Sequence, residues 1–169
     1  MSKWVDQQNA VLADTVYCDN VLAAKNVTVN LPEITFATSE INTMGTTELP
    51  LVGLVEAMEA TLSKIGADSQ LIAMSTPQKH NYECRFVQNS IGADGTATAK
   101  GCKAFITGIP KSVPGIAVEV GSATEGEIPI AVTRYQLYVD GEEMLCVDKL
   151  NSICRIKGKD YYAEIAAYL

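Results

Sequence analysis

The chain has 169 residues and carries 20 acidic against 13 basic side chains, which gives a formal net charge of -7. This acidity excludes a protein that grips nucleic acid from outside through a basic surface, and it disfavours adsorption to anionic lipid. The length of 169 residues is enough for one domain and short for two. The single histidine, His80, excludes any mechanism or metal site that needs two histidines.

The five cysteines form no CxxC pair, and their odd number argues against a disulfide-stapled secreted fold. Reduced thiols in a cytosolic compartment are the simpler interpretation. Cys102, between Lys100 and Lys103, is a candidate for a reactive thiol, against the more common role of a small strand residue. The N-terminal stretch predicts no secretory signal, and no stretch approaches the ~20 apolar residues of a membrane helix.

Alternation and tight turns dominate the local patterns. Runs of β-branched and aromatic residues, separated by Gly, Asp, Asn and Pro, predict strands over most of the chain. Asp94-Gly95 and Asp140-Gly141 each follow an extended run and predict hairpin turns in which both central residues need φ > 0. The predicted strands lie at residues 15–18, 26–30, 34–41, 82–87, 100–107, 116–120, 128–139, 143–147 and 153–156.

Two segments are predicted to be helical. Residues 67–75 form a short helical pattern with Asp68 as its cap and Pro77 beyond its end. Residues 160–169 have a helical composition, with Asp160 as the expected N-cap.

The region between these strands and the first helix is less clear. Residues 42–50 predict a polar loop that holds Gly45. Residues 51–65 fit a helix by propensity, whereas a weaker period-2 pattern fits a strand. With about eight or more short strands, the whole chain is predicted to be one compact, mainly β domain.

The sequence lacks the common signatures of a chemical site. It has no phosphate-binding glycine loop and no nucleophile elbow, and residues 140–143 match a turn better than a calcium loop. His80 is expected to be a solvated loop residue rather than a general base. Glu56 and Glu59 suit acid-pair hydrolysis only if their segment is helical, since a strand puts them on opposite faces.

Two stretches carry a resemblance to a known family. Residues 133–153, TRYQLYVDGEEMLCVDKLNSI, are followed by Lys-Gly-Lys-Asp at 157–160. They contain a strand, an Asp-Gly-Glu turn, a strand with an acidic residue, an Asn-containing bend and a last strand with a glycine turn. Upstream, VTVNLPEI at 27–34 precedes a polar loop with Met44-Gly45. This order resembles the major tail tube proteins of contractile-tailed phages, also used in phage-derived R-type bacteriocins, closely over 133–160 and loosely over most of the chain.

The resemblance implies a phage tail tube fold. This is a mainly β sandwich or barrel with a short helix near residues 67–75 and a short C-terminal helix. It implies one domain spanning residues 1–169, with a protruding loop at about 42–50. The family has a strand before its short helix, so 55–65 is assigned to a strand.

The resemblance also implies a structural subunit that is not an enzyme and has no catalytic, metal or cofactor site. Such subunits form homo-hexameric rings that stack into a hollow tube inside a sheath, without a membrane anchor. The expected place is the virion tail, after synthesis in the host bacterial cytoplasm.

Two sets of side chains are candidates for roles in such a tube. DNA passes through the lumen without specific binding, and acidic walls repel its phosphates. The candidate lumen acids are Glu40, Glu48, Glu56 and Glu59. The protruding loop is expected to reach the neighbouring ring through apolar residues that a monomer would leave exposed, or else to fold back on its own core. The candidate inter-ring residues are Ile41, Met44, Gly45, Leu49 and Leu51.

Other functions remain open at this point. A bacteriocin or secretion-apparatus tube shares the fold without carrying DNA. An acid-pair hydrolase that uses Glu56 and Glu59, and a generic β-sandwich binding module, are the alternatives outside the tube class.

Overall fold

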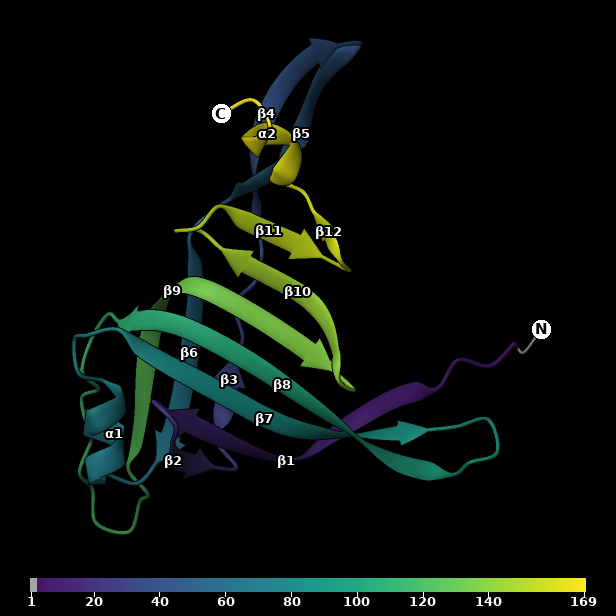
Figure 1. The fold of residues 1–169 in the computed structure, drawn as a ribbon. Coiled ribbons are helices and arrows are strands. Elements are labelled where there is room, and N and C mark those ends of the chain that lie inside the picture. The colour runs from purple at the N-terminus through teal and green to yellow at the C-terminus, as the bar shows by residue number, and fades with distance from the viewer. Residues whose placement is uncertain (1–2) are drawn as a thin grey trace.

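A computed structural model describes residues 3–169 as a mainly β protein with two short helices (Figure 1). Met1 and Ser2, with which the predicted domain begins, lie outside the described residues. The strands are β1 (Gln7–Cys18), β2 (Val21–Lys25), β3 (Thr28–Asn30), β4 (Phe36–Thr43), β5 (Gly45–Val55), β6 (Met58–Ile65), β7 (His80–Ile91), β8 (Ala97–Pro110), β9 (Glu125–Val139), β10 (Glu142–Asp148), β11 (Ile153–Ile156) and β12 (Lys159–Asp160). The helices are α1 (Ser69–Met74) and α2 (Ala163–Ala166).

One long strand, β9, joins the two layers of the fold. Its first half pairs with β6 and its second half with β10, while β8 pairs with residues 130–139 of β9. The larger layer has the order β12-β11-β10-β9-β8-β7-β1-β2, and the smaller layer adds β6 and β3 to the first half of β9. Figure 1 shows β3 and β6 behind β7 and β8, so the sheet folds back over itself.

The core lies between these layers and explains why residues 58–65 form a strand. Alternate β6 residues point inward and are buried, whereas the residues between them, such as Glu59, face outward. A strand with one buried face needs apolar side chains only at every second position. β6 has them at these positions, although its composition favours a helix. The predicted strand is confirmed from Met58; Val55 instead ends β5. The inward residues of β6 and β9 are Met58, Ala60, Leu62, Ile128, Ile130 and Val132.

Gly108 lies where β9 leaves no room for a side chain on β8. A methyl group at this position would overlap the Ala131 carbonyl oxygen and lie 2.7 Å from Ile130 Cγ2. The β8–β9 register shifts between Thr107 and Gly108, next to the point where β9 passes from β10 to β6. A residue without a Cβ is therefore required at this crossing.

The first predicted helix and its cap are confirmed. Asp68 precedes α1 in an extended conformation, and its Oδ1 accepts a hydrogen bond of 2.9 Å from the Leu71 backbone N–H. Leu71 and Met74 are buried, and they close one end of the core.

The C-terminal helix is shorter than predicted, and its predicted cap is wrong. α2 begins at Ala163, with Tyr162 at its N-cap position. Asp160 lies in β12 instead, and its Oδ1 accepts from the backbone N–H groups of Tyr162 at 2.9 Å and Cys154 at 3.3 Å. The short aspartate side chain stabilises a β-turn region here rather than a helix start.

Two local predictions are wrong in full or in part. Residues 116–120 do not form a strand, and Val118 and Val120 are 89% and 103% exposed, because no neighbouring strand pairs with them. The predicted hairpin at Asp94-Gly95 is confirmed between β7 and β8, but its loop spans residues 92–96 and only Gly95 of the pair has positive φ. In this loop Asp94 Oδ1 accepts from the Thr96 backbone N–H at 3.0 Å. The second predicted turn is confirmed, since Asp140 and Gly141 have φ of 52° and 79°.

All five cysteines of the described chain are free and buried. Among the described residues, no helix has the length and apolar character needed to cross a membrane.

Candidate assembly surfaces

The segment predicted as a polar loop over 42–50 is mostly a β-hairpin. β4 and β5 form a separate two-stranded sheet that projects from the body, with its tip far from the core (Figure 1). Thr43 lies opposite Gly45, so Met44 forms the tip and is fully exposed, at 105%. The prediction of a loop was wrong because hydrogen bonds between β4 and β5 satisfy the backbone N–H and C=O groups of both strands. This holds even where the body of the protein covers neither face of the hairpin.

The two faces of the hairpin differ in chemistry. Side chains directly opposite each other in an antiparallel pair lie on the same face, and neighbours along a strand alternate. Glu40 lies opposite Glu48, so two carboxylates share one face. Ile41 and Leu49 lie on the other face, and alternation along β5 adds Leu51 to them.

The apolar face of the hairpin is open in the isolated chain. Ile41, Leu49 and Leu51 are 42%, 46% and 41% exposed, which rules out the alternative of a loop folded back on its own core. Single exposed apolar residues are common on protein surfaces, but a row on one hairpin face is typical of a contact surface.

The root of the hairpin packs against the C-terminal helix. Gly53 is buried and has φ of +98°. A Cβ there would lie 3.0 Å from the Tyr161 carbonyl oxygen and 3.3 Å from Ile165 Cδ1. Glycine thus provides both the backbone conformation and the space for this contact.

The other two predicted lumen acids lie apart from the hairpin acids. Glu56 is exposed in the link between β5 and β6, where its backbone N–H donates to Thr35 O at 2.8 Å. Glu59 lies on the outward face of β6, and Lys111 Nζ donates to its Oε2 at 2.5 Å. Glu59 therefore has a local counter-ion.

Two acids that sequence reasoning missed share the face of Glu59. In the β6–β9 register Glu125 lies opposite Ile65, and Glu127 lies opposite Ser63. Both glutamates are exposed, and with Glu59 they form what we call the acidic face. The Glu-x-Glu spacing before a β-branched run was an available signal, but the predicted strand began at residue 128.

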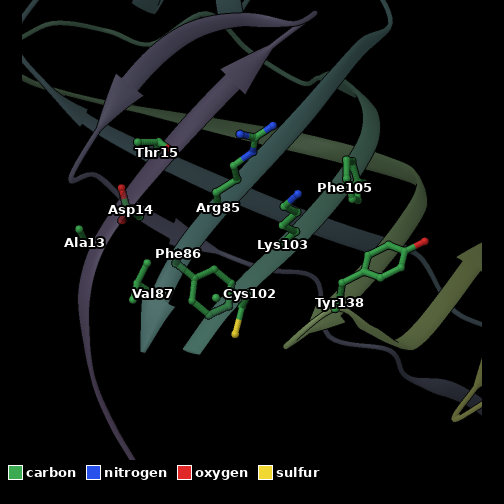
Figure 2. A pocket seen from close by; sticks show the side chains of 12 residues that line it. Ala13, Asp14, Thr15, Arg85, Phe86, Val87, Cys102, Lys103, Phe105 and Tyr138 are labelled. Carbon is green, nitrogen blue, oxygen red and sulfur yellow. The ribbon is translucent and has the colours of Figure 1, made fainter. Parts of the chain in front are cut away.

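A groove of about 600 Å³ lies along β1, β7 and β8 near the β9–β10 turn. Figure 2 shows Arg85, Lys103 and Tyr138 around it, with Cys102 among the lining residues. Cys102 Sγ donates weakly to Gln88 Oε1 at 3.8 Å, and burial raises the pKa of this thiol. The lysines beside Cys102 do not activate it, so the interpretation as a buried strand residue is confirmed.

His80 is buried at 2% exposure, so its prediction as a solvated loop residue is wrong. Its Nδ1 lies 2.7 Å from Asp19 Oδ2 and 3.7 Å from Cys18 Sγ, and its Nε2 lies 2.8 Å from Thr76 Oγ1. These partners come from the β1–β2 turn and from the exit of α1, which meet only in the folded chain.

The cluster around His80 also perturbs its neighbours. Burial, and next the adjacent Asp19 charge, raise the pKa of the Cys18 thiol to about 12. The pKa of Asp19 is lowered, first by the hydrogen bond from the Asn81 backbone N–H and then by the bond with His80.

Comparison with known proteins identifies the family. The model of the family described as "Phage tail tube protein FII" matches residues 9–169. The chain belongs to this family. It is a structural tail tube protein of a phage or of a contractile injection system, and it is not an enzyme. The acid-pair hydrolase and the generic binding module are thereby excluded.

Two solved structures have the same tail tube fold. A chain of the PVC sheath-tube complex of an extracellular contractile injection system, in its extended state, is 16% identical with a TM-score of 0.51; the match covers 75% of this chain and 88% of that chain. A chain of the PVC sheath/tube terminator is 15% identical with a TM-score of 0.53, and covers 77% and 96% respectively. No curated protein sequence gives a significant match.

Proposed function

We propose that this chain is the repeating subunit of a contractile tail tube, as one tail tube domain whose homo-hexameric rings stack into a hollow tube. The observation that carries this proposal is the family match over residues 9–169. A sheath is the expected outer partner in the virion tail, since the similar solved chains belong to a sheath-tube complex and a sheath/tube terminator.

In this assembly the β4–β5 hairpin contacts the neighbouring ring. Its apolar row, Ile41, Leu49 and Leu51, and the tip residue Met44 are exposed in the single chain. Complete burial of an aliphatic side chain contributes about 1.5–3 kcal/mol. Even half of that per residue, repeated in every subunit of a ring, is enough to favour stacking.

The lumen is acidic and lets DNA pass without specific binding. The Glu40–Glu48 pair and the acidic face of Glu59, Glu125 and Glu127 are the candidate lumen walls. A ring of six subunits multiplies these charges, and a negative wall in a narrow channel repels phosphate. Glu56, in the link between these two regions, is the remaining candidate.

A tube that carries no DNA is the second candidate. The likeness to chains of an extracellular contractile injection system favours it, and a phage-derived bacteriocin tube belongs to the same class. The two candidates are separated by whether particles from the producing cells contain DNA.

Electron microscopy of the purified full chain tests the proposal. Rings or tubes with an open channel support it, whereas a dispersed monomer at high concentration contradicts it. Deletion of residues 43–47 shortens the hairpin and should abolish tubes while the circular dichroism of the subunit stays unchanged.

The deletion has a matched control. Leu150→Ser removes an apolar side chain that is 78% exposed in the β10–β11 turn, and it should leave tube yield unchanged. Wild-type tube yield after the deletion overturns the role of the hairpin. A tube reconstruction with Glu125 and Glu127 on the outer wall overturns the lumen assignment of the acidic face.

A further inference from the structure

The cluster of Cys18, Asp19 and His80 has the composition of a metal site. One sulfur, one carboxylate oxygen and one imidazole nitrogen lie within 4.8 Å of one another. His80 is 2% exposed and Cys18 is 9% exposed, whereas the Asp19 side chain is 48% exposed. Two ligand atoms are therefore buried on the core side, and the third lies at an opening to solvent.

The hydrogen bonds of His80 fix which ring nitrogen faces the cluster. The Thr76 hydroxyl donates its own proton to Ala73 O at 3.1 Å, so it can only accept from His80 Nε2 at 2.8 Å. The Thr76 carbonyl oxygen, an acceptor as well, lies 3.2 Å from the same nitrogen. Nε2 therefore carries a proton, and the second nitrogen, Nδ1, points at Asp19 and Cys18.

Asp19 is oriented in the same manner. Its Oδ1 accepts from the Asn81 backbone N–H at 3.0 Å, which leaves Oδ2 directed at His80. Asp19 and Asn20 have φ of 50° and 67°, so the tight β1–β2 turn holds the carboxylate beside the start of β7. Outer hydrogen bonds that orient a histidine and a carboxylate toward one point are the usual second layer of metal sites.

We propose that Cys18 Sγ, Asp19 Oδ2 and His80 Nδ1 bind one Zn²⁺ ion, with water in the fourth position. Sulfur, nitrogen and oxygen ligands in tetrahedral geometry suit Zn²⁺. Ideal zinc bonds put sulfur roughly 3.5–3.6 Å from the nitrogen and the oxygen. In the structure Cys18 Sγ lies 3.7 Å from His80 Nδ1 and 3.8 Å from Asp19 Oδ2.

One distance must change when the ion binds. His80 Nδ1 and Asp19 Oδ2 are 2.7 Å apart, a hydrogen-bond length, and zinc ligands need a separation of roughly 3.4 Å. A small rotation of the half-exposed Asp19 side chain opens this gap. The Cys18 thiol and His80 Nδ1, which donates to Asp19 Oδ2 in the metal-free chain, each release a proton to solvent as the Zn–S and Zn–N bonds form, so no redox partner is needed.

The ion connects segments that are distant in sequence. It ties the β1–β2 turn to the start of β7, beside the exit of α1, and this role is structural. It does not depend on ring formation, so failure of the tube proposal leaves it intact.

Titration of the reduced full chain with ZnCl₂ tests the proposal. We expect one ion per chain and a rise in Tm of roughly 5–10 °C at free zinc 100-fold above the Kd. CoCl₂ should give the visible absorption of tetrahedral cobalt together with a thiolate-to-cobalt band. Absence of a saturable single site, or octahedral cobalt without a thiolate band, overturns the proposal.

Variants separate this site from adventitious binding. Cys18→Ser should lose the thiolate band and most of the Tm shift, whereas Cys84→Ser, another buried strand cysteine outside the cluster, should retain both. Thr76→Val removes the hydroxyl that accepts from His80 and donates to Ala73 O, and it should weaken zinc binding roughly 10- to 100-fold. Equal zinc binding by Cys18→Ser and the wild type contradicts the assignment, even if a His80 variant fails to fold.

Discussion

Replacement of Gly108 by alanine tests whether the crossing of β8 and β9 depends on the missing side chain. The new Cβ would overlap the Ala131 carbonyl oxygen and lie 2.7 Å from Ile130 Cγ2, and neither neighbour is the free end of a flexible side chain. Relief requires the two strands to separate beside the register shift at Thr107. Overpacking of this kind costs about 3 kcal/mol, the upper end of the usual range.

The matched control lies on the same strand. Gly101 has no atom within 4 Å of an ideal Cβ, and its φ is not positive, so Gly101→Ala should stay within ~0.5 kcal/mol of the wild type. For a chain of this size, a loss of about 3 kcal/mol lowers Tm by ~6–12 °C. Urea and thermal unfolding followed by circular dichroism measure both variants. Equal stability of Gly108→Ala and Gly101→Ala would refute the reasoning.

Two further predictions concern α1 and the hairpin. Asp68→Ala should cost about 1 kcal/mol because it removes the helix cap, and the loss should be measured by urea unfolding. The pKa of Asp68 is lowered from 3.8 by Lys64 first and by the Leu71 N–H next, so its contribution is full at neutral pH and disappears as pH falls through the folded-state pKa. A gap between variant and wild type that keeps its full size at pH 2 contradicts this. Glu40→Lys replaces repulsion between Glu40 and Glu48 with attraction, and it should slow amide hydrogen exchange in the hairpin about two- to five-fold. The double variant Glu40→Lys/Glu48→Lys restores repulsion and should lose this effect. Unchanged exchange in the single variant argues against the register.

Local chemistry was sufficient to predict the β9–β10 turn and the first helix. Asp140-Gly141 specifies its turn because both residues take positive φ, and Asp68 caps α1 through a bond three residues away. Such contacts span a few residues and can be read from spacing. The strand at 58–65, in contrast, was predicted from the family resemblance. By propensity its Leu, Ala and Met residues favour a helix. They form a strand because only one face of β6 packs against the core.

The predictions from sequence failed where contacts between distant segments determine the local structure. Residues 116–120 have the composition of a strand but no partner, so pairing rather than propensity was missing. His80 seemed to lie in a solvated loop, yet Asp19 and Thr76 enclose it from two other segments. Cys18 and Asp19, which the proposed zinc site joins to His80, lie 62 and 61 residues from it in the sequence, so spacing could not have grouped the three.

The face on which each side chain lies was harder to predict than the strands and helices themselves. Glu40 and Glu48 could be named from the sequence, but only the register makes them neighbours on one side of the hairpin. The same applies to Glu125 and Glu127, which the pairing with β6 brings to the face of Glu59.

The contact at Gly53 links the protruding hairpin to the order of synthesis. Tyr161 and Ile165 pack against this glycine at the hairpin root, yet they are made more than a hundred residues after it. A chain still growing on the ribosome has β4 and β5 but lacks the segment that supports their base. The final orientation of the hairpin is therefore reached only after residues 161–165 have emerged, late in translation.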